Sequence, residues 1–333
     1  MRLILQFIWK IKSSILNLAQ VKMTANGIML EKNNTKVLLD PKRGTSTLAF
    51  VSHAHTDHLH NQSQGLILTT KQTCEIARQR GFSIENYVEE YLGFEMVDSG
   101  HILGAKGLVF DDVFYTGDIC TRSRSFMKGA KIPKCKTLIT ECTFGMPEYV
   151  FPKTDDVVRQ VNAIISDLYS RGKPVILLGY ELGKSQILSD LFSHWEPYYH
   201  DSIKKINDLY RRFGVNIRDS IGHTEAENNG LLDKKPWLMI APNLSTKNAF
   251  VKHMKSKYDA ITIGFSGWAK SSRFAFSRGH DYSIPLSDHC DYNELVELVK
   301  ACNPEKIYTV HGFVEEFATE LTKMGFDAQP LKE

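Results

Sequence analysis

The chain has 333 residues, of which 42% are hydrophobic and 24% are charged. This length allows about two domains, each able to bury a sizeable core, and the composition is that of an ordinary globular protein. The formal net charge is only +3, which excludes a strong global attraction for nucleic acid. Such an affinity would have to come from local basic clusters.

The six cysteines are scattered and form no Cys-x-x-Cys pair, which argues against a zinc knuckle or a disulfide framework and favours a reducing cytoplasm. Residues 1–21 are largely apolar, but Gln6 and Lys10 interrupt them well before the roughly 18 residues that a membrane-spanning helix needs. We expect an amphipathic helix or an over-extended start here, with Met23 as an alternative beginning. The expectation is a cytoplasmic protein without a membrane span.

The first strand-like runs, residues 27–31 and 35–39, are separated by Lys32-Asn33-Asn34, which predicts a hairpin followed by Asp40. Residues 48–51 predict the next strand and residues 66–68 another. A helix is expected over residues 71–80, because Gly81 follows its last apolar turn.

The strand over residues 48–51 leads into His53-Ala54-His55-Thr56-Asp57-His58. Imidazoles and a carboxylate packed this closely would repel one another if the histidines were protonated, and together they suit zinc or a related cation. In an extended segment the first two histidines project to one side, while a turn after Thr56 can aim Asp57 and His58 elsewhere. One segment could therefore serve two adjacent metal ions. A histidine-rich surface loop is the alternative.

Further candidate ligands lie in turns or at the ends of later predicted strands. Each of them alone could equally be a turn residue, a surface carboxylate or a buried, hydrogen-bonded histidine. When these candidates are considered together with the histidine segment, a role in metal binding or catalysis becomes the better hypothesis. These candidates are His101, Asp118, Glu141, His289 and His311.

Two segments could bind phosphate. Arg122 and Arg124 open a stretch to residue 136 with six basic and no acidic residues, which could neutralise phosphates or simply be a solvated loop. Residues 179–185 read Gly-x-x-x-Gly-Lys-Ser, one residue shorter than a nucleotide phosphate loop, so nucleotide hydrolysis is disfavoured. Lys184 and Ser185 at a predicted helix N-terminus still favour a phosphate, such as one in a nucleic-acid backbone. Trp268 could stack on a base or pack in the core.

Together these residues resemble the metallo-β-lactamase fold with the β-CASP insertion, over about residues 24–333. This nuclease family includes messenger-RNA cleavage and polyadenylation endonucleases, Artemis-like DNA nucleases and bacterial ligase-associated DNA exonucleases. The last group is the closest likeness, through residues 139–145, 183–186 and 286–289. The first four family motifs are matched by Asp40, the His53–His58 segment, His101 and Asp118, and those of the β-CASP branch by Glu141, His289 and His311.

The resemblance implies an α/β fold, an αββα metallo-β-lactamase sandwich with an inserted α/β β-CASP domain. It places an N-terminal extension at residues 1–23, the first part of the metallo-β-lactamase domain at 24–150, the insertion at 151–274 and the second part at 275–333.

It further implies two zinc ions, for which Mn²⁺ could substitute. His53, His55 and His101 would hold one ion, Asp57, His58 and His311 would hold the other, Asp118 would bridge them, and Asp40 would orient a ligand histidine. In the implied reaction Asp57 accepts a proton from the attacking water, and His289, supported by Glu141, protonates the leaving oxygen.

We therefore expect a zinc-dependent nuclease that hydrolyses phosphodiester bonds of DNA or RNA, as an exonuclease in nucleic-acid repair or RNA processing. A DNA ligase or a repair or processing complex is the expected partner. His311 favours RNA, whereas the ligase-associated likeness favours DNA. The alternatives are a hydrolase of a small ester or thioester on the same fold, and a non-catalytic binding scaffold.

Overall fold

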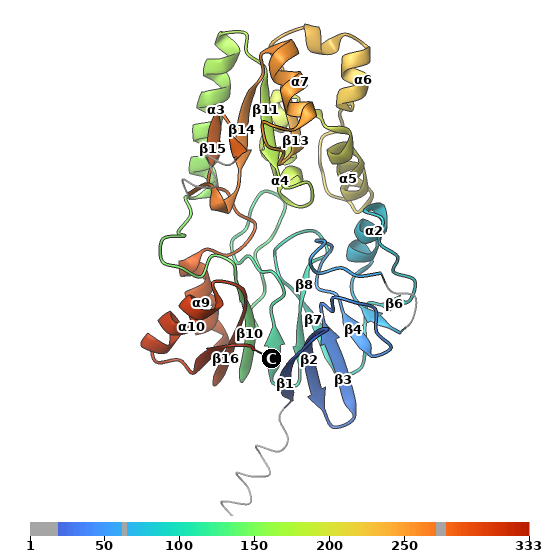
Figure 1. Cartoon of the computed structure of the whole chain (residues 1–333), viewed down its shortest axis with the longest axis vertical. Helices are drawn as coiled ribbons and strands as arrows, with labels where there is room; N and C mark the ends of the chain where they lie inside the picture. Colours follow the sequence, from blue (N-terminus) through green and yellow to red (C-terminus); the bar gives the residue numbers. More distant parts are fainter. Residues whose placement is uncertain (1–18, 62–64, 271–277, 333) are drawn as a thin grey trace, which may run out of the picture.

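The computed structural model describes residues 19–61, 65–270 and 278–332. Two six-stranded sheets lie in the lower half of Figure 1, and a five-stranded sheet with its own helices lies above them. None of the helices in these described ranges is long and apolar enough to cross a membrane.

The first sheet runs in the order β1-β2-β3-β4-β5-β6. The predicted hairpin is present, because the second and third strands pair antiparallel with Lys32 opposite Thr35. Residues 1–18 of the expected N-terminal extension lie outside the described ranges, whereas residues from Gln20 onward form the edge strand. The strands are β1 Gln20–Thr24, β2 Gly27–Lys32, β3 Thr35–Leu39, β4 Leu48–Phe50, β5 Ile67–Leu68 and β6 Tyr87–Val88.

The second sheet runs in the order β17-β16-β10-β9-β8-β7 and packs on the first. Side chains such as Leu30, Phe50, Tyr115 and Val310 from both sheets share one buried cluster, so the two inner faces form a common core. The strands are β7 Phe94–Asp98, β8 Lys106–Phe110, β9 Val113–Tyr115, β10 Thr137–Cys142, β16 Lys306–Gly312 and β17 Ala328–Pro330.

Helices cover the outer faces of this pair of sheets. Helix α2, Lys71–Gln79, packs with strands β4 and β5 in one cluster, and α9, Tyr292–Cys302, and α10, Val314–Lys323, pack with β10 and β16 in another. Helix α9 begins at a capping box, in which Asp291 accepts from the backbone N–H of Glu294 and Glu294 from that of Asp291. The αββα sandwich expected from the sequence is therefore confirmed.

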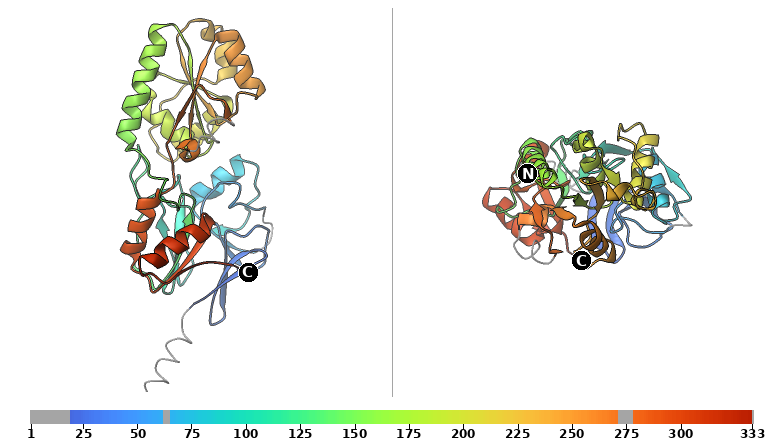
Figure 2. Two further views of the ribbon diagram at one scale, coloured as in Figure 1. Left: turned by 60° about the vertical axis from the view of Figure 1, so that its left-hand side comes forward. Right: turned by 90° about the horizontal axis from the view of Figure 1, so that it is seen from above.

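The third sheet runs β12-β13-β11-β14-β15 with every pairing parallel. Alternate residues of its central strand are buried against helices on opposite faces, Val175 and Leu177 with α3 and Ile176 and Leu178 with α7. Figure 2 shows this sheet nearly edge-on between α3 and α7. The elements are α3 Thr154–Ser170, β11 Val175–Gly179, α4 Lys184–Leu191, η1 Ser193–Trp195, β12 Tyr198–Tyr199, α5 Asp201–Arg212, α6 His223–Asn228, η2 Leu231–Asp233, β13 Leu238–Pro242, α7 Ala249–Tyr258, β14 Ile261–Phe265, η3 Gly267–Lys270 and β15 Tyr282–Ile284.

We refer to α3 through β15 as the third-sheet unit. Its last strand, β15, pairs with β14 and follows residue 274, where the sequence places the end of the insertion. The sheet therefore includes a segment from beyond that boundary, and the domain limits remain a prediction. The loops after β11, β14 and β15 all reach one cavity that also meets the sandwich.

Candidate metal centre

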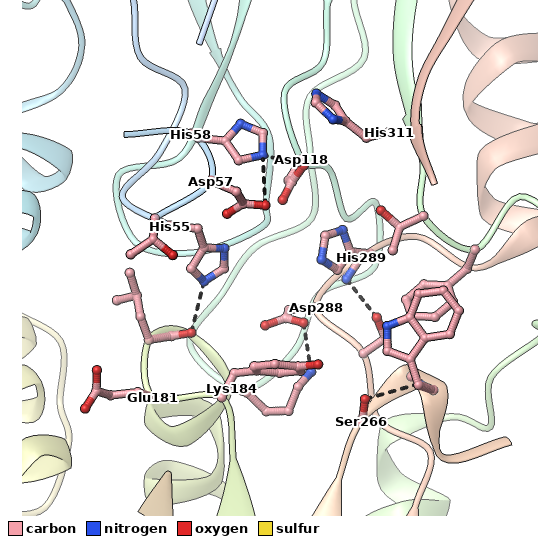
Figure 3. A pocket seen from close by; sticks show the side chains of 18 of the residues that line it. His55, Asp57, His58, Asp118, Glu181, Lys184, Ser266, Asp288, His289 and His311 are labelled. Atoms are coloured by element: carbon pink, nitrogen blue, oxygen red, sulfur yellow. Dashed lines mark hydrogen bonds and ion pairs between the residues drawn. The ribbon is translucent and has the colours of Figure 1, made fainter. Parts of the chain in front are cut away.

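A cavity of about 420 Å³ lies where the third-sheet unit meets the sandwich (Figure 3). Polar and aromatic side chains from all three sheets converge on it, so segments far apart in the sequence share one site. Its lining includes His55, Asp57, His58, Arg80, Asp118, Thr143, Tyr180, Lys184, Trp268, Asp288, His289 and His311.

The first group of candidate ligands consists of His53, His55, His101 and Asp118, whose donor atoms lie within 4.8 Å of one another. Nδ1 of His55 lies 3.1 Å from Nε2 of His53 and 3.1 Å from Nε2 of His101. Oδ2 of Asp118 lies 3.4 Å from Nε2 of His53 and 3.5 Å from Nε2 of His101. Three imidazole nitrogens and one carboxylate oxygen this close together could hold a metal ion.

The second group faces the other oxygen of the same aspartate. Oδ1 of Asp118 lies 3.4 Å from Nε2 of His58, and Oδ2 of Asp57 lies 3.8 Å from that nitrogen. The ring of His311 lies beside that of His58, with centroids 5.3 Å apart, and the labelled side chains surround a common space in Figure 3. Asp118 thus places one carboxylate oxygen near each group of candidate ligands.

A bulge between two strands places His311. Glu141 pairs with Val310 but Cys142 pairs with Gly312, so His311 is the extra residue of β16. Its φ of 55° lies in the left-handed region, which is uncommon for a residue other than glycine. Such strain persists at functional sites when the surrounding structure enforces it.

Asp40 contacts the Nδ1 side of the His58 ring. Its Oδ2 lies 2.8 Å from Nδ1 of His58 and accepts hydrogen bonds from the hydroxyls of Ser52 and Tyr115. Burial lowers the pKa of His58, but the charges of Asp118 and Asp40 outweigh it and raise that pKa well above its usual range. Nδ1 of His58 faces Asp40, so Nε2, which faces Asp118, is the nitrogen that could bind a metal ion.

His55 and His101 are arranged as neutral ligands. Nε2 of His55 lies 3.2 Å from the carbonyl of Leu182, and Nδ1 of His101 lies 2.9 Å from the carbonyl of Asp288. Donation of these N–H groups leaves the opposite nitrogen of each ring with a free lone pair. Burial, followed by the charge of His53, lowers the pKa of His55 to about 4. Burial, followed by the charge of His289, lowers the pKa of His101 well below its usual range.

A histidine–carboxylate pair stands at the edge of the first group. Nδ1 of His289 lies 2.8 Å from Oε1 of Glu141, which is buried and also accepts from the backbone N–H groups of Ile119 and Thr143. Burial lowers the pKa of His289, but the charges of Glu141 and Asp118 outweigh it and raise that pKa to about 9. His289 is therefore a protonated group at neutral pH, able to give a proton to an atom in the cavity.

The predicted phosphate-binding residues make internal contacts in the structure. Ser185 is fully buried with its hydroxyl bonded to the carbonyl of Gly179, and the Lys184 ammonium is buried against Asp288. Arg124 is buried and donates to the carbonyls of Gly100 and His101. Arg122 pairs with Glu294 and donates to two carbonyls. Each of these side chains makes internal hydrogen bonds, and a role in phosphate binding stays a prediction.

The sequence reading missed other residues of the cavity. Arg80, at the C-terminal end of α2, donates to the carbonyl of Ala54 and is one of the residues that line the cavity. Tyr180 also lines it and is 39% exposed. Trp268 lines the cavity while packing against Phe144, with ring centroids 4.8 Å apart, and stacking on a base stays a prediction. A basic residue at a helix end or a tyrosine after a strand carries no distinctive sequence signal.

Comparisons with known proteins agree with this site. Residues 280–329 match the family model described as the Zn-dependent metallo-hydrolase RNA specificity domain. A probable DNA ligase of Opitutus terrae is 30% identical over 302 residues, which cover 86% of this chain and 29% of that protein. An RNase J-like protein of Methanocaldococcus jannaschii is 22% identical, covering 79% of this chain and 80% of that protein.

The 5′ exonuclease Apollo of Rattus norvegicus is 22% identical, covering 86% of this chain and 55% of that protein. This chain thus spans less than a third of the ligase and about half of Apollo. A crystal structure of a protein of unknown function from Enterococcus faecalis V583 superimposes with a TM-score of 0.62 at 14% identity, covering 94% of this chain and 96% of that one, which shows a common fold. The fold, the family match and these relatives place the chain in the β-CASP family of the metallo-β-lactamase fold.

Proposed function

We propose that this chain is a metal-dependent nuclease that hydrolyses phosphodiester bonds in DNA or RNA, with two zinc ions or Mn²⁺ as cofactors. The observation that carries the proposal is the position of Asp118, which faces one group of ligands with each oxygen, beside the His289–Glu141 pair. Two neighbouring cation positions flanked by a proton donor suit in-line displacement at phosphorus.

Bound at these positions, two divalent ions would supply Lewis acidity and neutralise charge at the phosphoryl group. Asp57, whose side chain is 78% exposed, stands where it can accept the proton of an attacking water. His289 faces the cavity in its protonated form and would donate a proton to the leaving oxygen. Glu141 holds the His289 ring in orientation.

The names of the relatives support a nucleic acid as the substrate. The relatives carry the names of a DNA ligase, an RNase J-like protein and a 5′ exonuclease, and all three names concern nucleic acids. We propose an exonuclease in DNA repair or RNA processing, acting alongside a DNA ligase or a repair or processing complex. The six free thiols agree with the reducing cytoplasm proposed as its location.

A hydrolase of a small ester or thioester is the competing function on this fold. Such an enzyme needs the metal ligands, but it has no evident use for a cavity bounded by a second α/β unit. Tyr180, Lys184 and Trp268 of that unit all line the cavity, which favours a large substrate.

The test is incubation of the purified chain with 5′- and 3′-labelled DNA and RNA, with and without a chelator, and with a thioester in parallel. We expect chelator-sensitive cleavage of a nucleic acid. Asp118→Asn should lose bound metal and reduce cleavage about 1,000-fold, equivalent to about 4 kcal/mol of transition-state stabilisation. Asp112→Asn, the same change at an exposed carboxylate outside the cavity, should have no effect. Thioester hydrolysis without nuclease activity would refute the proposal.

A further inference from the structure

The turn Leu182–Lys184 of the third-sheet unit contacts both ends of the first ligand group. The carbonyl of Leu182 is the partner of Nε2 of His55, at 3.2 Å. Nζ of Lys184 donates to Oδ1 of Asp288 at 2.8 Å, and the carbonyl of Asp288 is in turn the partner of Nδ1 of His101 at 2.9 Å. One short turn therefore reaches two candidate zinc ligands, directly in one case and through a single residue in the other.

Lys184 is bonded to the 286–288 segment at two points. Besides the Asp288 carboxylate, its ammonium donates to the carbonyl of Leu286 at 2.9 Å. The side chains of Lys184 and Asp288 are only 2% and 8% exposed, so solvent screens this ion pair little (Figure 3). The two bonds fix the backbone that presents the Asp288 carbonyl to His101.

The turn also packs directly on the residue that follows His101. Gly183 has a φ of 89°, and a Cβ added there would clash with Cγ2 of Ile102 and lie 3.4 Å from Oδ2 of Asp288. This close approach requires glycine, so the turn and the His101 segment form one packed contact. Movement of the turn would therefore change the position of His101.

We propose that Lys184 is a positioning residue for the metal centre: through Asp288 it orients His101, and with the Leu182 carbonyl it holds the turn that orients His55. The inference rests on the proposed function, because it assumes that this group of side chains binds zinc. The third-sheet unit would then help to hold the metal as well as form one boundary of the cavity. Partners that orient ligand histidines typically contribute 10- to 100-fold to metal affinity.

The test compares full-length wild type, Lys184→Met and Lys255→Met. Methionine keeps most of the side-chain volume without the ammonium, and Lys255 forms an ion pair with Asp281 in the same unit, away from the cavity. Zinc affinity is measured by competition with a chelator, and the Co²⁺-loaded proteins are compared by absorption spectroscopy. We expect about 10- to 100-fold weaker zinc binding and an altered Co²⁺ spectrum for Lys184→Met, and wild-type values for Lys255→Met.

A second variant separates positioning from the burial of an unpaired carboxylate. Lys184→Met with Asp288→Asn removes both charges but leaves the Asp288 carbonyl, so it should restore the melting temperature without restoring zinc affinity. If Lys184→Met does not fold, this double variant provides the affinity measurement. Wild-type affinity and spectrum in either variant would overturn the inference while leaving the nuclease proposal intact. A wild-type chain that binds no metal would instead overturn the proposed function.

Discussion

The pKa of each histidine in this site depends on how deeply the ring is buried and on the charges around it. His289 is surrounded by Glu141, Asp118 and Asp288, and the carboxylates raise its pKa although burial opposes this. His55, without a carboxylate bonded to its ring, has its pKa lowered by burial instead. The same residue type is therefore suited to act as a neutral ligand at one position and as a proton donor at another.

The proposed role of His289 predicts a loss of turnover without a loss of metal. His289→Gln should reduce kcat about 100- to 10,000-fold while zinc content stays at the wild-type level. Since the protonated form donates, wild-type kcat should fall as the pH rises through about 9. Steady-state kinetics between pH 6 and about 10 and metal analysis would check both points.

Glu141 supplies the control for this pH dependence. Glu141→Gln removes a negative charge that raises the pKa of His289, so the alkaline limb of kcat should move to lower pH. An alkaline limb unchanged in both variants would mean that His289 is not the donor.

A strand bulge, a turn and a helix cap each place a polar group at a defined position in the fold. The bulge in β16 moves His311 out of the regular pairing register, and the turn before α4 carries Leu182 and Lys184 to the ligands. At the start of α5, His200 is the N-cap, and its Nδ1 accepts from the backbone N–H of Ser202. That acceptor exists only while His200 is neutral.

The cap of α5 predicts a pH-dependent stability away from the metal centre. Burial and then the charge of His223 lower the pKa of His200 to about 4, so between pH 6.5 and 4 the unfolded chain binds the extra proton. Stability present above pH 6.5 should be lost as the pH falls through this window, by on the order of 1 kcal/mol at pH 5.

The comparison is His200→Asn, which keeps a side-chain acceptor at the N-cap but does not titrate. Denaturant unfolding at pH 7 and pH 5 should show a smaller loss for this variant than for wild type. Equal losses would show that His200 does not carry the effect.

At the scale of the whole molecule, the cavity exists only because two α/β units face one another. The sandwich supplies the candidate metal ligands, and the third-sheet unit supplies Tyr180 and Trp268 to the lining of the same cavity. A substrate in the cavity would be close to both the candidate metal ligands and these aromatic rings. Aromatic rings stack on nucleic-acid bases without strong sequence preference.

This arrangement predicts that Tyr180 contributes to binding of nucleic acid more than to chemistry. Tyr180→Ala should weaken binding of a single-stranded oligonucleotide about 5- to 100-fold, the value of one stacked base, and reduce hydrolysis of a small phosphodiester much less. Tyr282→Ala is the matched control, because Tyr282 has similar exposure, 36% against 39%, and lies outside the cavity. Equal effects of the two substitutions in a binding titration would contradict the role of Tyr180.

The candidate metal ligands and catalytic residues could be identified from the sequence because they lie in a dense segment, His53–His58, in predicted turns or at the ends of predicted strands. Strand ends meet at one edge of a sheet, so candidates as distant as Asp118 and His311 could be expected together. The main strands of the sandwich were also predictable from their apolar runs. Short edge strands such as β6 and β12, with two residues each, were missed because they carry no periodic pattern.

The amino-acid sequence by itself determined the set of candidate donor groups, through residue types and local spacing, and the class of fold, through its resemblance to a known family. Only the tertiary structure decided that each oxygen of Asp118 faces a different group of candidate ligands, and that Lys184 and Ser185 are buried and hydrogen-bonded inside the protein. The physical reason is that burial and the choice of partner depend on segments distant in the chain. The Lys184 ammonium meets a carboxylate 104 residues away, and no local pattern encodes that contact.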